Sequence, residues 1–127
     1  MKHVAILREP YYSMILDGSK TIESRFSLNK VAPYNKVKKG DVILLKATGK
    51  DVKASFEVRD VQYFELTPEV VEGIRVKYGK AIGTDKPEDW VATKEKKYGT
   101  LIWVCNVKQT DIIKVPKSNG AGWLILE

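Results

Sequence analysis

The 127-residue sequence contains only one cysteine and one histidine, Cys105 and His3. A single cysteine excludes an internal disulfide, and one thiol with one imidazole is too few for the ligand sets of structural zinc sites. We therefore expect neither a metal nor a cofactor. The simplest interpretation of both residues is a structural one.

Long apolar runs are also missing from the sequence. No stretch approaches the roughly 20 apolar residues that a membrane helix needs, and the apolar run near the N-terminus is too short for a signal peptide. We therefore expect a cytoplasmic location and no membrane partner. Hydrophobic residues make up 43% of the chain and charged residues 30%, which is typical of a folded protein. Without repeats, low-complexity segments or linkers, the prediction is a single domain over residues 1–127.

Acidic residues are scarce in one part of the chain. The formal net charge is +6, and residues 30–53 hold seven lysines against two acidic residues, so this basic protein carries most of its excess charge there. Clustered cations favour a polyanionic partner such as nucleic acid, because neutralising phosphates releases condensed counterions. The alternative is an ordinary solvated lysine-rich surface. Charge alone leaves both interpretations open.

Apolar patterning and turn residues predict about six strands and about three helices. Pro10 and Gly18 bound a short first helix. Thr67, followed by a proline and a glutamate, predicts the start of a second helix that ends near Tyr78. A third is expected from residue 85 to near residue 99. The count of about six strands comes from seven strand-like segments, residues 3–8, 20–26, 41–48, 52–64, 100–108, 110–115 and 122–126.

The order of these elements predicts an α+β fold. The helices are inserted between strands and do not alternate with them, which argues against a parallel doubly wound sheet. It favours a small, mainly antiparallel, curved or barrel-like sheet with helices at its ends.

The most informative motif is Gly18-Ser-Lys-Thr-Ile-Glu-Ser-Arg25, a G-x-K-x-x-E-x-R pattern between the first helix and the second strand. With Lys39-Gly-Asp41 before the next strand, it resembles the ASCH domain family, a branch of the PUA-like superfamily. The resemblance covers most of the chain. It implies a small PUA-like β-barrel with a cleft lined by the motif, and recognition of RNA or of a modified nucleoside.

Three residues of the motif suit such a ligand. Lys20 offers a mobile charge for phosphate, Arg25 offers a planar fork for bidentate contacts or stacking, and Glu23 can accept from a base amino group. In an ideal strand Glu23 and Arg25 share one face. Lys20 joins them only if it leaves from the turn before the strand. The alternative is a Glu23–Arg25 ion pair on an outer face of the sheet, which would contribute little to the stability of the fold.

Other residues are weaker binding candidates. Arg8 could lie at the rim of the same cleft. Tyr34, in the lysine-rich segment, could stack on a base or merely anchor its loop. Lys46 interrupts an apolar strand, so it could point into the cleft or mark the open end of the barrel. The tryptophans are expected in the core.

The resemblance also raises the possibility of catalysis. Some ASCH relatives are amidohydrolases of acylated cytidine, and ribonuclease activity has been attributed to others. The amidohydrolase type has a threonine three residues after the motif lysine, whereas this sequence has Glu23 there. We therefore predict a non-catalytic RNA-binding or modified-nucleoside-recognising module, and the sequence leaves open an acid–base pair of Lys20 and Glu23. The alternatives are a small hydrolase of the amidohydrolase or ribonuclease type, and a protein-interaction domain.

Overall fold

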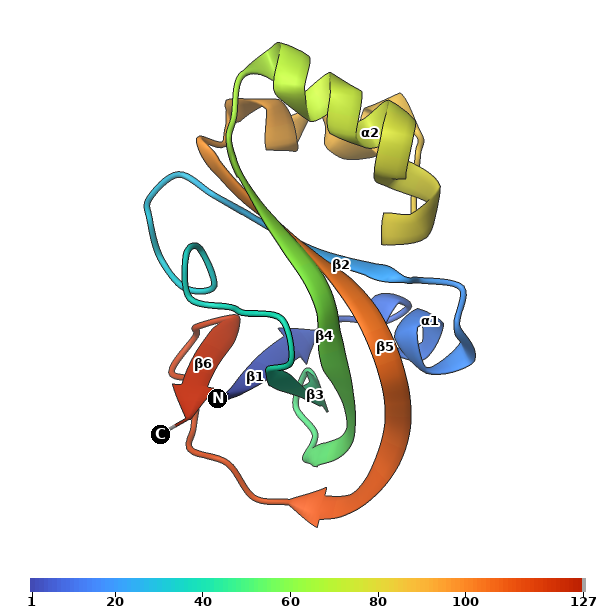
Figure 1. Ribbon diagram of the computed structural model, residues 1–127, viewed down its shortest axis with the longest axis vertical. Helices are drawn as coiled ribbons and strands as arrows, with labels where there is room; N and C mark the ends of the chain where they lie inside the picture. Colours follow the sequence, from blue (N-terminus) through green and yellow to red (C-terminus); the bar gives the residue numbers. More distant parts are fainter. Residues whose placement is uncertain (127) are drawn as a thin grey trace.

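The computed structural model describes residues 1–126, in which one six-stranded sheet curls into a half-barrel flanked by helices (Figure 1). The α-helices and strands are β1 (Lys2–Leu7), α1 (Tyr11–Asp17), β2 (Ile22–Ser27), β3 (Val42–Ala47), β4 (Val52–Glu65), α2 (Pro68–Ile82), β5 (Tyr98–Ile113) and β6 (Trp123–Leu126). Two short 3-10 turns, η1 (Pro87–Trp90) and η2 (Ala92–Glu95), precede β5. The α+β prediction is confirmed.

The strand order is β2-β5-β4-β3-β1-β6, and only the β1–β3 pair is parallel. The long strands β4 and β5 run side by side through the molecule and bend strongly (Figure 1). Three register shifts between them accommodate this bend, because each bulge increases the local twist of a strand pair. The first and last strands of the order, β2 and β6, do not pair with each other, which leaves a seam in the barrel.

The first two helices begin where the sequence predicts. Gly18 ends α1 in the left-handed conformation, with φ of 85°. The hydroxyl of Thr67 accepts from the Val70 amide at 3.2 Å and caps α2. However, α2 continues past Gly79 to Ile82. A Cβ at position 79 would lie 2.8 Å from the Cα of Asp85, so this glycine permits close packing and does not end the helix.

Two other boundaries also differ from the prediction. The third helix is replaced by the two 3-10 turns, because the buried Trp90 indole donates to the Thr84 carbonyl at 2.9 Å and fixes the chain there. The two strands expected over 100–108 and 110–115 form one strand, β5, which continues through Asn106 at φ of 51°. A bulge bends this strand where the sequence indicated a break.

The segment Lys39-Gly-Asp41 leads into β3 and holds the N-terminal end of the sheet. Asp41 accepts from the Lys38 amide at 3.0 Å and lies 2.8 Å from Nε2 of the buried His3. The Trp123 indole donates to Nδ1 of His3 at 3.1 Å. Because an indole nitrogen only donates, Nδ1 must be the acceptor and the proton of His3 lies on Nε2, toward Asp41. His3 is therefore structural, as the sequence suggested.

Candidate functional site

A cleft of about 380 Å³ opens where the end of β1, helix α1, strand β2 and the η1–η2 segment meet. Its volume falls within the range of small-molecule sites in proteins. The motif lies along it, and the lining residues are Ile6, Leu7, Arg8, Tyr11, Lys20, Glu23, Ser24, Arg25, Phe26, Ile82, Thr84, Asp89, Trp90 and Thr93. The structure therefore brings Arg8, Lys20, Glu23 and Arg25 together at one hollow.

The place where β2 begins explains how Lys20 reaches the cleft. Regular strand structure begins at Ile22, so Lys20 leaves from the turn after α1, where strand alternation has not yet started. The Lys20 amide donates to the Met14 carbonyl at 3.0 Å and the Thr21 amide to the Ala81 carbonyl at 2.9 Å. These two bonds fix the turn between α1 and the end of α2.

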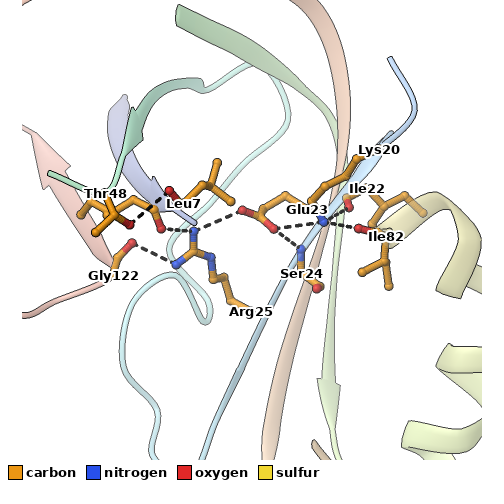
Figure 2. Close-up of polar contacts among 10 residues, drawn as sticks. Leu7, Lys20, Ile22, Glu23, Ser24, Arg25, Thr48, Ile82 and Gly122 are labelled. Carbon is orange, nitrogen blue, oxygen red and sulfur yellow. Dashed lines mark hydrogen bonds and ion pairs between the residues drawn. The ribbon is translucent and has the colours of Figure 1, made fainter. Parts of the chain in front are cut away.

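Lys20, Glu23 and Arg25 form a continuous ionic chain (Figure 2). The Glu23 carboxylate lies 3.4 Å from the Lys20 ammonium and 3.2 Å from the Arg25 guanidinium, and it also accepts from the Ser24 amide at 2.8 Å. Glu23 and Lys20 are 2% and 3% exposed. The pair on an outer face, which the sequence left open as an alternative, is therefore excluded by burial. We call these three residues the buried triad.

Lys20 is fixed in place, which differs from the mobile charge expected from the sequence. Its ammonium donates to the Ile22 carbonyl at 2.9 Å and to the Ile82 carbonyl at the end of α2. With Glu23, these acceptors account for all three N–H groups of a lysine. No hydroxyl is among the partners of this ammonium within residues 1–126.

Arg25 spans the seam between β2 and β6. Its guanidinium donates to the carbonyl of Gly122 just before β6 (Figure 2). It also donates to the carbonyl of Ile6 on β1, and both distances are 3.0 Å. It also lies 5.3 Å from the ring of Trp123 on β6. A Cβ on Gly122 would be only 2.9 Å from the guanidinium, so the glycine makes room for it. Arg25 thus supplies hydrogen bonds where the sheet has no backbone pairing.

The electrostatic environment favours the ionised form of Glu23, and for Lys20 it only partly opposes burial, so the pKa of Lys20 stays below its usual value. Burial by itself raises the pKa of Glu23, but Arg25, Lys20 and the Ser24 amide together outweigh it and hold this pKa below its usual value. Burial lowers the pKa of Lys20, and the Glu23 carboxylate opposes that effect. With two cations and one anion, the triad carries one net positive charge at the floor of the cleft.

The opposite wall comes from a part of the chain that sequence reasoning did not connect with the motif. The hydroxyl of Thr84 donates to Asp89 at 2.5 Å, and Trp90 packs edge-on against Phe26 with ring centroids 5.7 Å apart. Tyr11, on α1, faces the Lys20 ammonium at 5.5 Å. The sequence assigned Trp90 to the core, and no local signal pairs residues 84–93 with β2.

Of the other predicted binding residues, Arg8 is exposed and lines the cleft, whereas Tyr34 and Lys46 do not line it. Tyr34 lines a second, smaller hollow on the other side of Arg25. Lys46 is next to Ile6 in the β1–β3 pairing but lines neither hollow. Tyr34 packs against Tyr63 and Tyr98, so it does anchor its loop.

The lysine-rich segment does not form one patch. Lys38 and Lys39 precede β3 whereas Lys50 and Lys53 follow it, and a six-residue strand is about 20 Å long. These four lysines therefore lie toward opposite ends of β3, whereas Lys46 lies within it and Lys30 lies beside Tyr98. The lysines are therefore closer together in the sequence than they are in the folded protein.

Residues 1–126 contain no group of three His, Cys, Asp or Glu side chains that could hold a metal ion. None of the helices in the same range is both long enough and apolar enough to cross a membrane.

The curled half-barrel is similar in fold to solved structures of ASCH proteins. The family model of the ASCH domain matches residues 6–117, and the chain belongs to this family. ASCH domains have a PUA-like fold that is generally thought to bind RNA.

Solved structures agree with this assignment. The ASCH protein of Zymomonas mobilis is similar at 15% identity with a TM-score of 0.68, over 90% of this chain and 73% of that one. A mutant of that protein is similar at 16% identity with the same TM-score, over 88% and 72%. The hypothetical protein PH0355 is 22% identical with a TM-score of 0.58, over 82% and 97%. No curated protein matches the chain. At these identities the likeness establishes the fold.

Proposed function

We propose that this protein is an RNA-binding module whose cleft receives one unstacked nucleotide of a single strand. The observation that carries the proposal is the composition of the cleft, whose lining combines the buried triad and its net positive charge with the aromatic side chains of Tyr11, Phe26 and Trp90. Sequence-specific proteins recognise RNA mainly through unstacked bases, which stack on aromatic rings and form hydrogen bonds along their edges. A duplex cannot present a base in this way.

Hydrogen-bonding groups for a base remain at the floor of the cleft. An arginine has five N–H groups, and three of those on Arg25 are used by Ile6, Gly122 and Glu23. Two remain for a ligand. On the opposite wall, the hydroxyl of Thr93 can donate or accept, whereas that of Thr84, which donates to Asp89, can only accept from a ligand. A base between these walls would meet guanidinium donors on one side and these hydroxyls on the other.

The rim of the cleft suits a phosphate. Arg8 is exposed there, and no ion pair involves it within residues 1–126. An unpaired guanidinium can bind a phosphate in bidentate fashion. Arg8 is therefore the residue we expect to hold the backbone of the strand.

The same geometry gives little support to hydrolysis. A hydroxyl nucleophile needs a neighbouring base within hydrogen-bond reach, and Lys20 has its three N–H groups directed at Glu23 and two carbonyls. Glu23 occupies the position where the amidohydrolase type has a threonine. We therefore propose binding without catalysis.

The experiment is a titration of single-stranded RNA against the protein at low salt, followed by fluorescence anisotropy, with a duplex of the same sequence for comparison. Thr93→Trp, which fills the cleft from η2, should weaken binding of the single strand by about tenfold or more. Thr110→Trp is the matched control, because Thr110 is equally half-buried but lies on β5 away from the cleft. It should leave binding unchanged.

Two results would contradict the proposal. One is an affinity no tighter than about 100 µM, the weak end of non-specific nucleic-acid binding. The other is binding that Thr93→Trp and Thr110→Trp affect equally.

A further inference from the structure

A second hollow of about 170 Å³ adjoins the cleft. The two share Arg25 and Phe26 as a common wall. The second hollow is otherwise lined by the loop after β2 and by residues next to the seam, namely Ser27, Val31, Ala32, Pro33, Tyr34, Thr100, Gly122 and Trp123. Because its volume is less than half that of the cleft, it suits a planar ring without an attached sugar.

The walls of the second hollow are held in place before any ligand arrives. The ring of Tyr34 packs against those of Tyr98 and Tyr63, with centroids 5.0 Å and 5.4 Å apart. The Tyr63 hydroxyl accepts from the Val37 amide at 2.8 Å and donates to the Val37 carbonyl at 2.6 Å. These contacts fix the C-terminal end of the loop segment that forms the hollow, which reduces the conformational entropy lost on binding.

The wall between the two hollows carries positive charge. Arg25 is 21% exposed at its side chain, and only one carboxylate, Glu23, serves both Arg25 and Lys20. Lys30 lies on the same side of the molecule, with its ammonium 5.5 Å from the ring of Tyr98. An anionic group that passes from the cleft to the second hollow would therefore cross a surface with uncompensated positive charge.

We propose that the second hollow receives the base adjacent to the one in the cleft, so that the domain binds two successive nucleotides with their linking phosphate beside Arg25. This inference rests on the proposed function of the cleft. The occupant follows from three features of the hollow: its ring-sized volume, its aromatic and proline lining, and the cation on the wall that it shares with the cleft. A protein side chain would fit the volume, but would not account for that cation.

The test uses an RNA dinucleotide and two versions of it, each lacking one of the two bases, titrated against ¹⁵N-labelled protein by NMR. The complete dinucleotide should bind about 5- to 150-fold more tightly than either abasic version, which corresponds to about 1–3 kcal/mol per stacked base. Val31→Trp, which fills the second hollow, should remove this gain and leave the affinity of the better abasic version unchanged.

Leu28→Trp is the matched control, because Leu28 and Val31 are both 55% exposed and lie in the same loop, but only Val31 lines a hollow. Leu28→Trp should keep the full gain in affinity of the dinucleotide over its abasic versions. Val31→Asp is a second variant that leaves the hollow open and places a carboxylate beside the expected phosphate, so it should also reduce the gain. The NMR spectra report directly whether each variant is folded.

The possible results separate the two proposals. If the dinucleotide binds no better than its abasic versions, or if Val31→Trp and Leu28→Trp behave alike, the second hollow is not a base site. If Thr93→Trp still weakens binding in that case, the cleft proposal stands. If none of the three ligands binds, or if Thr93→Trp has no effect on any of them, the proposed function itself is wrong and this inference fails with it.

Discussion

The motif segment 20–25 and the lysine-rich segment 30–53 are both basic, but they place their charges in opposite environments. Lys20 is 3% exposed and has three acceptors, whereas Lys36, Lys38 and Lys39 are exposed at the surface. A buried charge must be paired and hydrogen-bonded, because desolvation is otherwise too costly. An exposed lysine needs no partner.

This difference separates two roles that look alike in the sequence. The buried triad fixes β2 relative to β1, β6 and α2, and it shapes the cleft. The exposed lysines can attract phosphates at long range, and dissolved salt screens that attraction. If the proposed function holds, we expect charge in the first segment to contribute mainly to stability and selectivity, and charge in the second mainly to affinity.

The largest effect is expected when the buried triad loses its only carboxylate. Glu23→Gln leaves the buried Lys20 cation and the partly buried Arg25 cation without a counter-charge, and breaking a buried pair costs about 3–5 kcal/mol of unfolding free energy. Denaturant unfolding followed by tryptophan fluorescence measures this loss. Glu88→Gln is the control, because Glu88 is exposed on η1 and has no ion pair within residues 1–126. A loss below about 1 kcal/mol for Glu23→Gln would contradict the assigned role.

A smaller effect on the free energy of unfolding is expected when the pH is lowered. For Asp41, burial raises the pKa, but His3, the Lys38 amide and the N-terminal amine outweigh burial and hold the pKa below its usual 3.8. Glu23 is likewise held below its usual pKa of 4.5. The unfolded chain therefore takes up protons first, so the stabilisation is complete above about pH 4.5 and is lost as the pH falls through the lower folded values.

Unfolding measured between pH 7 and pH 2 tests this expectation. Each group contributes a slope of at most about 1.4 kcal/mol per pH unit. Glu23→Gln should flatten the acid limb relative to the wild type. Identical slopes for the two proteins would show that Glu23 does not titrate differently in the folded and unfolded states.

The smallest effect is expected when exposed lysines are replaced by alanine, and it concerns the affinity for RNA. Lys30→Ala with Lys36→Ala removes two charges from the loop beside the second hollow, and should weaken binding to all RNA sequences alike. The slope of log K against the logarithm of the salt concentration should become less steep by about 0.7 for each phosphate of a single strand that the variant no longer neutralises. Lys53→Ala with Lys108→Ala removes the same charge from exposed positions on β4 and β5 that line neither hollow. An equal change in both double variants would mean that only net charge matters.

Local sequence signals predicted the parts of the fold that depend on local physics. Pro10 and Gly18 bound α1 because one residue has a fixed φ and the other tolerates a left-handed one. Thr67 begins α2 because its hydroxyl satisfies a free amide. Gly79 misled the prediction because a glycine that permits close packing looks the same in the sequence as one that ends a helix.

The candidate site was only half predictable for a similar reason. The spacing of Lys20, Glu23 and Arg25 is local, so the motif could be found and its convergence argued from where β2 begins. That Arg25 would cross the seam to Gly122, 97 residues away, depends on how the sheet curls. The wall formed by Thr84, Asp89 and Trp90 also comes from a distant part of the chain.

The α+β class, the residues of the triad and the excess of lysine in residues 30–53 all follow from the order of amino acids, without a structure. The burial and pairing of the triad, the separation of lysines toward opposite ends of β3, and the place of Arg25 between two hollows required the folded molecule. Composition and periodicity reflect interactions within a few residues. Composition and periodicity do not determine burial and charge pairing, because burial and pairing depend on which distant strands the curled sheet brings together.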